Sequence, residues 1–369
     1  MNLNYPIKII SIIIPTYNEY KNLPILLDKL LNLKTTFEKE IIIVDDNSSD
    51  GTNDLARNYS QLDRRIRFIN RLGRSGLSSA IKEGCLCASG DLVVIMDADG
   101  QHEPNTIIDG LKIFDQKNID IIIGSRFLEE SIIRGLSSGR KSGSSIANSL
   151  ARFSLHSKYK NLTDFMTGFI ILKRNTCIKF IEKIDVNGFK FLYELLSLSK
   201  GKLTIIEIPL VFGQREYGQS KLDLAVIWDF LISLMHNLFG RLIPRRAFSF
   251  ALVGLIGVFV QMTIIYILLG ITNYQFEQVL PIGVIIAASS NYTINNILTF
   301  RSNKLSGKYF YFGLLKFLLV ASLPIIANIG VANLFYNQLS NNTFVAQLAG
   351  IFVVFIWNYA ASSRVVWNN

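Results

Sequence analysis

Short apolar runs alternate with amphipathic stretches over the first third of the chain. The runs that predict buried strands lie at residues 9–14, 40–44, 67–69, 91–96 and 120–124. The stretches between them have helical spacing of apolar residues, at 23–33, 52–59, 75–88 and 105–117. This alternation predicts an α/β fold with a Rossmann-like, mostly parallel sheet covered by helices on both faces. Ligands bind such sheets beyond the carboxyl ends of the strands.

The last third of the chain has a different pattern. Residues 247–369 contain only six charged side chains. Long apolar runs fill this region, at 247–271, 279–300, 309–335 and 344–367. Each is close to or above the ~20 residues that cross a bilayer, and too few charges remain to give soluble helices their solvent faces. We therefore predict an α/β domain at 1–222, an amphipathic interface helix and linker at 223–246, and a transmembrane domain with four helices at 247–369.

Positive charge lies on one side of the predicted spans. Basic residues precede the first span and lie between the second and third, namely Arg241, Arg245, Arg246, Arg301, Lys304 and Lys308. The other two loops, 272–278 and 337–343, carry no Lys or Arg. Positive-inside reasoning places both termini and the α/β domain in the cytoplasm. The absence of a signal-peptide pattern in residues 1–10 and of a disulfide pattern among three cysteines favours the same compartment.

Polar residues follow several predicted strands, and the acidic ones suggest a metal. Asp97 and Asp99 lie two residues apart at a strand exit, followed by Gln101. Carboxylates and an amide oxygen suit Mg²⁺ or Mn²⁺. The alternative is that such turns merely cap helices, as Asp50 would for the helix at 52–59. For His102, the sequence is compatible with a direct role and with a structural one.

The net charge of +10 points to an anionic partner. Basic residues alternate with apolar ones in one region, which contains Arg134, Arg140, Lys141, Ile146, Leu150, Arg152, Phe153, Leu155, Lys158 and Lys160. This pattern, and that of residues 223–241 with Trp228, Phe230, Leu234 and Phe239, suits helices lying on a lipid bilayer. Ordinary packing on the α/β domain is the alternative. No recognition motif accompanies the charge, so nucleic-acid binding is not expected. Dinucleotide and P-loop glycine motifs are missing as well.

The ordered motifs resemble a known family. They read PTYNE (15–19), VDDNSSDGT (44–52), NRLGRSGLSSAIKEG (70–84), MDADGQHEP (96–104), GSRF (124–127), TGFIILKR (167–174), GFKFLYELL (188–196) and EIPLVFGQREYGQSKL (207–222). Together they resemble GT-A-fold, family 2 glycosyltransferases, in particular dolichol-phosphate mannose synthases and related polyprenyl-phosphate glycosyltransferases. NYTINNILTF (291–300) and WNYAASSRVVW (357–367) resemble GtrA-like membrane domains.

The resemblance implies roles for matching residues. Those matching the nucleotide-sugar donor site are Pro15, Tyr17, Glu19, Val44, Asp46, Asp97, Ala98, Lys190, Arg215 and Lys221. Asp97, Asp99 and Gln101 match metal ligands, and Arg126, Arg140 and Ser144 match residues that meet the lipid phosphate. Asp99, Arg126 and Arg215 are the catalytic candidates. Gly100, Glu103 and Thr167 depart from the commoner family residues, without removing a presumed ligand.

The implied reaction is an inverting, metal-dependent transfer of one hexose to dolichyl or polyprenyl phosphate. A phosphate monoester is largely ionised at neutral pH, so no general base is needed. Mannose from GDP-mannose is the favoured donor, and glucose or another hexose from a UDP donor is the alternative. A processive polysaccharide synthase is disfavoured because residues 214–218 read QREYG rather than Q-x-x-R-W. A lipid-linked sugar transporter or scaffold is the alternative of another class.

Overall fold

The structure is a computed structural model that describes residues 9–72, 76–116, 118–134, 138–185, 190–215, 217, 224–322 and 343–367. For residues 115–116, 138–141 and 343–351 only the backbone is described. The chain divides into two units, Met1–Leu238 and Phe239–Asn369. The boundary falls at the end of an apolar helix, α8 (Leu224–Leu238), which therefore belongs to the first unit.

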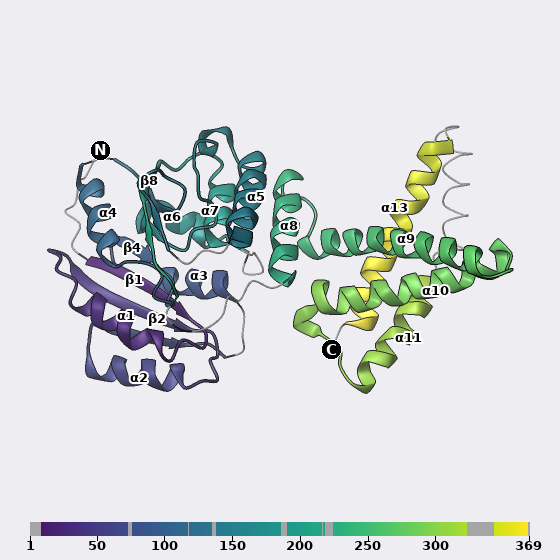
Figure 1. Ribbon diagram of the computed structural model, residues 1–369, viewed down its shortest axis with the longest axis horizontal. Coiled ribbons are helices and arrows are strands. Elements are labelled where there is room, and N and C mark those ends of the chain that lie inside the picture. Colours follow the sequence, from purple (N-terminus) through teal and green to yellow (C-terminus); the bar gives the residue numbers. More distant parts are fainter. Residues whose placement is uncertain are drawn as a thin grey trace. The chain divides into compact units, whose positions relative to one another are not determined.

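A seven-stranded sheet runs through the first unit (Figure 1). Its strands are β1 (Ile9–Thr16), β2 (Glu38–Asp45), β3 (Ile66–Asn70), β4 (Leu92–Ile95), β5 (Ile121–Ser125), β7 (Ile170–Lys173) and β8 (Ile205–Pro209). They are ordered β3-β2-β1-β4-β7-β5-β8, and only β7 runs antiparallel to its neighbours β4 and β5. The mostly parallel sheet is confirmed, and the five predicted strands are present within one or two residues at most ends.

Both faces of the sheet are buried because successive strand residues point to opposite sides. Ile13 and Ile42 belong to one core cluster, whereas Ile12 and Ile41 belong to the other. One face packs on α1 (Asn22–Leu31), α2 (Thr52–Leu62) and α4 (Asn105–Gln116). The other packs on α3 (Leu77–Cys87), α5 (Ser138–Ser154), α6 (Arg174–Ile181), α7 (Phe191–Ser199) and α8. The prediction of helices on both faces is confirmed.

The reversed strand β7 determines what meets at the edge where ligands bind. In a parallel sheet all carboxyl ends share one edge. Because β7 is antiparallel, its first residues lie at that edge, beside the last residues of β4 and β5. The segment ahead of β7, residues 163–169, therefore reaches the strand ends. A short parallel pair, β6 (Ile132–Ile133) with β9 (Val211–Phe212), adds a second small sheet.

Part of the predicted membrane-facing surface is wrong, because some of its apolar side chains are buried in the first unit. Phe230 and Leu234 are buried in the first unit's core, and the Phe230 ring packs edge-on against Tyr193 of α7 at 5.7 Å. Leu155, directly after α5, is also buried. These side chains face the α/β domain because they complete its core. The exposed apolar side of the two helices is instead formed by Ile146, Leu150, Phe153, Leu224, Ile227, Leu231 and Leu238.

The second unit is helical in the part that the structure describes. It contains α9 (Arg245–Ile271), α10 (Phe276–Ile294), α11 (Lys308–Ser322) and α13 (Thr343–Ala361). Among the described residues, α9 alone is long and apolar enough by itself to cross a membrane. The predicted third span, 309–335, is described only as far as Ser322. Helices α9 and α10 approach closely: a Cβ at Gly257 would lie 2.3 Å from the Asn291 amide nitrogen, as small-residue packing in membranes requires.

The two membrane-domain motifs have the same local structure. Asn291-Tyr292 and Asn358-Tyr359 each begin a segment that passes through a π-helix, Asn295–Thr299 and Ser362–Val366, and ends in an aromatic residue. Those final rings, Phe300 and Trp367, stack with centroids 4.2 Å apart and planes 9° apart. The indole nitrogen of Trp367 donates to Asn296 Oδ1 at 3.0 Å. The motifs are thus the packing core of this unit.

Candidate active site

The acidic pair lies directly after β4 and is flanked by basic side chains. Arg215 Nη2 lies 2.5 Å from Asp99 Oδ2, and His102 Nε2 lies 3.5 Å from Asp97 Oδ2. Asp99 is buried, whereas the Asp97 side chain is 34% exposed. The charge of Asp97 also acts on Lys190, which lies directly before α7. The first unit therefore brings together Asp97, Asp99, Arg215 and Lys190 of the predicted donor site.

The pKa values of the two carboxyl groups are shifted in opposite directions. Burial disfavours ionisation of Asp97, but His102, Lys190 and Arg215 outweigh it and lower the pKa of Asp97. Burial raises the pKa of Asp99, and the charge of Asp97 adds to that rise despite Arg215. Burial likewise lowers the pKa of Lys190, against the charge of Asp97. The pair thus holds more negative charge than its surroundings easily accommodate, which is the condition that a bound cation relieves.

A glycine ahead of β7 makes room for Asp97. A Cβ at Gly168 would lie 2.3 Å from Asp97 Oδ2 and 2.8 Å from its Cγ. No side chain larger than hydrogen fits there unless the carboxylate moves. The reversed direction of β7 causes this approach, because it brings Gly168 to the end of β4.

The segment after β9 is fastened to the acidic loop. Gly213 N donates to Gln101 O at 2.8 Å, and Gln101 Nε2 donates to Gly213 O at 3.1 Å. His102 pairs with Phe212 in an isolated bridge, and its ring packs against Phe212 at 5.5 Å. Arg215 follows two residues after Gly213, so these bonds help to hold its guanidinium at Asp99. His102 is buried behind Asp97, in a supporting position.

The residues at this edge fit a divalent cation. In the part of the chain that the structure describes, no three His, Cys, Asp or Glu side chains converge on a metal position. Mg²⁺ is commonly held by one or two carboxylates and substrate phosphates rather than by a complete protein cage. Asp97 and Asp99 provide the carboxylates. The amide nitrogen of Gln101 is engaged by Gly213, which leaves its oxygen as the ligand atom.

The predicted donor residues at the ends of β1 and β2 lie at the same edge of the sheet as the acidic pair, and their side chains differ in solvent exposure. Pro15 is buried, while Tyr17 and Glu19 are half-buried. The Val44 side chain packs in the core. Ala98, beside the acidic pair, is also buried.

Asp46 is held by an arginine that the sequence interpretation did not single out. Arg71 Nη1 lies 2.7 Å from Asp46 Oδ1, and Gly76 N donates to Asp46 Oδ2 at 2.8 Å. The Arg71 and Asp46 side chains are both nearly inaccessible to solvent. Asp46 thus supports the shape of the β2 exit from within.

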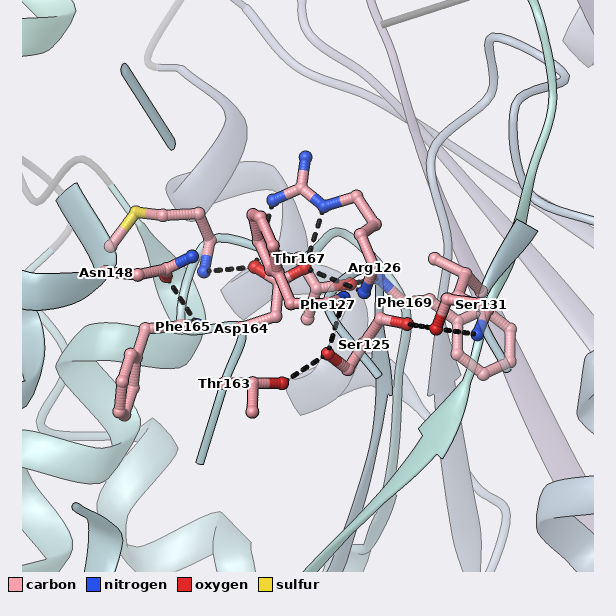
Figure 2. Close-up of polar contacts among 12 residues, drawn as sticks. Ser125, Arg126, Phe127, Ser131, Asn148, Thr163, Asp164, Phe165, Thr167 and Phe169 are labelled. Atoms are coloured by element: carbon pink, nitrogen blue, oxygen red, sulfur yellow. Dashed lines mark hydrogen bonds and ion pairs between the residues drawn. The ribbon is translucent and has the colours of Figure 1, made fainter. Parts of the chain in front are cut away.

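Arg126, after β5, forms a two-point ion pair with a buried carboxylate (Figure 2). Its Nε and Nη2 lie 2.7 and 2.9 Å from the two oxygens of Asp164. Asp164 has no solvent exposure. The third guanidinium nitrogen, Nη1, points away from the pair in Figure 2. Asp164 belongs to the segment ahead of β7 and was absent from the predicted site, although it lies three residues before the quoted TGF motif.

The other predicted acceptor residues are described in part. Ser144 is half-buried on α5. Arg140 lies on the same helix, but its side chain is outside the described set, as is the whole of Lys221. The acceptor group of Arg126, Arg140 and Ser144 therefore stays a prediction.

Comparison with known proteins gives two family matches that together cover most of the chain. A model described as glycosyl transferase family 2 matches residues 11–180, and one described as GtrA/DPMS, transmembrane domain matches residues 249–367. A dolichol-phosphate mannosyltransferase of Pyrococcus furiosus is 32% identical over 97% of this chain and 99% of its own length. An undecaprenyl-phosphate mannosyltransferase of Micrococcus luteus is 30% identical over 60% of this chain and 90% of its own.

Among solved structures, glucosyl-3-phosphoglycerate synthase from Mycobacterium tuberculosis, in complex with Mn²⁺, UDP and glucosyl-3-phosphoglycerate, aligns with a TM-score of 0.46 and 18% identity. The alignment covers 63% of this chain and 80% of that one.

Proposed function

Because the chain belongs to glycosyltransferase family 2 and carries a GtrA/DPMS transmembrane domain, we propose that it transfers mannose from GDP-mannose to a dolichyl or polyprenyl phosphate. The transfer is of a single sugar, with inversion, and depends on Mg²⁺ or Mn²⁺. The names of the relatives support mannosyl transfer to a polyprenyl phosphate.

One observation carries this proposal. Two arrangements suited to phosphate chemistry lie at one sheet edge, on strands separated only by β7. After β4, Asp97 and Asp99 form the acidic pair that would hold a metal-bound diphosphate. After β5, Arg126 offers a fixed guanidinium. A donor that leaves as a nucleoside diphosphate and an acceptor that arrives as a phosphate monoester need one arrangement each.

The chain's contribution to the reaction is positioning and charge. An oxygen of the acceptor phosphate attacks the anomeric carbon, and the bond to the nucleoside diphosphate breaks. The phosphate monoester already carries most of its second negative charge at neutral pH, with a second pKa of about 6. The site therefore needs no base, and Arg126 orients the nucleophile by hydrogen bonding from the part of its guanidinium that Asp164 does not engage.

On the donor side, Asp97, Asp99 and Gln101 would hold the divalent ion. When bound, it supplies positive charge that stabilises the departing diphosphate. Lys190 and Arg215 lie beside the same carboxylates and add donors for diphosphate oxygens. Arg215 is tethered through Gly213 to the acidic loop, so its position responds to whatever binds there.

The acceptor's lipid chain accounts for the apolar surface of the first unit. Phe153 on α5 is 76% exposed and Leu224 on α8 is 77% exposed, and with the other exposed apolar side chains of these helices they form a patch of the kind that marks an interaction surface. We assign this side of the two helices to the bilayer surface, at the cytoplasmic face that the basic loops favour.

A donor panel tests the proposal. The full-length protein in detergent is incubated with farnesyl phosphate, Mg²⁺ or Mn²⁺, and labelled GDP-mannose, UDP-glucose or another UDP-hexose. We expect one mannose per acceptor and no transfer after chelation with EDTA. If only a UDP-sugar is transferred, the proposed donor GDP-mannose is wrong and a UDP-hexose takes its place. Formation of a long polymer, or transfer without a metal, would refute the proposed reaction.

A further inference from the structure

A buried carboxylate next to Arg126 has no part in the reaction as derived so far. We propose that Asp164 is a positioning residue, which orients the Arg126 guanidinium so that Nη1 faces the acceptor phosphate. This inference rests on the proposed function, because it assigns Arg126 to the acceptor. Its physical content is separate: Asp164 acts only through Arg126.

The contact between the two side chains has the geometry of a rigid fork. Asp164 Oδ2 accepts from Arg126 Nε at 2.7 Å and from the Arg126 backbone nitrogen at 3.2 Å. Asp164 Oδ1 accepts from Nη2 at 2.9 Å. Parallel bonds between a planar guanidinium and a planar carboxylate fix the plane as well as the position of the arginine. A guanidinium fixed in advance loses less conformational entropy when it binds an anion.

Asp164 and the residues on either side of it are held from three elements, and Figure 2 shows the contacts to β5 and α5. Glu207 of β8 accepts from the backbone nitrogens of Thr163 at 2.9 Å and Asp164 at 3.0 Å. The Thr163 hydroxyl lies 2.5 Å from the Ser125 hydroxyl of β5. Asn148 Oδ1 of α5 accepts from Phe165 N at 2.9 Å. With no solvent exposure and this many bonds on adjacent atoms, Asp164 has little freedom to follow a moving arginine.

The hydrogen bond between Asn148 and Phe165 also links α5 to the segment that holds Arg126. Asn148 lies four residues after Ser144 and eight after Arg140, so the three positions share one face of α5. The face that carries two predicted phosphate residues is therefore fastened to the segment that holds Arg126. Arg126 is thereby fixed relative to the helix from which the other acceptor contacts would come.

The two arginines of the site differ in their partners. Arg215 is paired with Asp99, a predicted metal ligand. Arg126 is paired with a carboxylate outside the acidic pair, and its guanidinium also lies 5.7 Å from the Phe212 ring centroid. Occupation of the acidic pair by a cation would compete for Arg215 but would leave the Arg126–Asp164 pair intact. Arg126 can thus keep one orientation throughout the reaction.

A double-mutant cycle on the full-length protein tests this role. Asp164→Asn keeps the volume and one acceptor oxygen but loses the fork. We expect kcat/KM for farnesyl phosphate to fall by about 10- to 100-fold, as for a reacting group displaced by up to about 1 Å, with KM for the donor unchanged. In an Arg126→Ala background, Asp164→Asn should add less than about twofold, because residues that act as a unit are not additive.

Glu207→Gln is the matched control. It makes the same carboxylate-to-amide change in the same network, but Glu207 contacts Thr163 and Asp164 through backbone and hydroxyl groups and does not touch Arg126. It should lower Tm and leave KM for farnesyl phosphate near that of the wild type. Additive effects in the cycle, or the same acceptor defect in Glu207→Gln, would overturn the inference in favour of a purely structural role.

Two further measurements keep the test decisive. If Asp164→Asn does not fold, Asp164→Glu takes its place; it keeps the charge but displaces the carboxylate by one methylene, so it should show the same acceptor-specific loss, and wild-type acceptor kinetics would refute the inference. If the wild type transfers no sugar to farnesyl phosphate, the proposed function fails. Calorimetric binding of farnesyl phosphate then decides the inference alone: weaker binding by Asp164→Asn supports it, and unchanged binding refutes it.

Discussion

Gly168 offers a direct test of how Asp97 is placed. The backbone φ of Gly168 is outside the left-handed region, so alanine is acceptable to the backbone and only the new methyl group matters. That methyl carbon would lie 2.3 Å from Asp97 Oδ2, 2.8 Å from Cγ and 3.1 Å from Oδ1. Carbon–oxygen contacts are ordinarily about 3.3 Å or longer, so the carboxylate must retreat by about 1 Å.

The magnitude follows from that displacement. The Asp97 side chain is 34% exposed, so it can move toward solvent, and the cost in folding free energy should stay near the low end of overpacking, about 1 kcal/mol. The cost in catalysis should be larger. A misplacement of about 1 Å reduces turnover by about 100-fold, which corresponds to about 2.7 kcal/mol of transition-state stabilisation. Gly168→Ala should therefore retain most of its stability and lose most of its activity.

The assay is transfer of labelled mannose to farnesyl phosphate over a range of Mn²⁺ concentrations, with thermal unfolding measured in parallel. We expect the Mn²⁺ concentration for half-maximal activity to rise. Gly110→Ala is the control, because its Cβ would meet Ile171 Cδ1 at 2.4 Å, an equally close approach within the apolar core. That variant should change Tm while keeping the wild-type Mn²⁺ dependence. Wild-type kcat/KM and Mn²⁺ dependence in Gly168→Ala would refute the placement of Asp97 at the metal.

Three further predictions concern the acidic pair and the membrane domain. Asp99→Ala should abolish metal-dependent transfer while circular dichroism shows an intact fold; retained activity with Mn²⁺ would refute the metal assignment. Deletion of residues 247–369 should release the protein from membranes more than it slows transfer to excess acceptor in detergent, and complete loss of transfer would mean that this region does more than anchor. Asn296→Ala should cost roughly 2–3 kcal/mol, seen as a lower Tm in detergent, because it removes partners from Leu305 and Trp367 that are held at 2.9 and 3.0 Å; an unchanged Tm would contradict this.

Hydrophobic pattern was sufficient to predict most of the sheet because its strands are buried on both faces. Ile12, Ile13 and Ile14 are all inaccessible to solvent, so β1 appears in the sequence as a continuous apolar run. The polar residues that end such runs are equally visible, and Asp97 and Asp99 were found in this way, whereas the role of Arg126 came from the family resemblance. The segment at 170–173 is also apolar, but its insertion between β4 and β5 depends on pairing partners that a local pattern does not contain.

Sequence analysis missed some residues for the same reason, namely that a local pattern does not show which segments pair or pack together. Asp164 and Gly168 matter because β7 reverses direction and carries them to the ends of other strands. Phe230 and Leu234 were interpreted as membrane-facing because α8 is apolar on more than one side. Periodicity identifies an apolar side of a helix, but it does not say whether a protein core or a lipid surface covers that side.

The reversed strand also explains how one site can handle two phosphates. Gly168 adjoins Asp97 on the donor side, and Asp164, four residues earlier, holds Arg126 on the acceptor side. Four residues span at most ~14 Å even when fully extended, so this segment limits the distance between the two charged centres. A sugar transferred between phosphates must be reached from both, and this single short segment links the two centres. The geometry of transfer thus depends on the packing of the residues ahead of β7 as much as on the acidic pair itself.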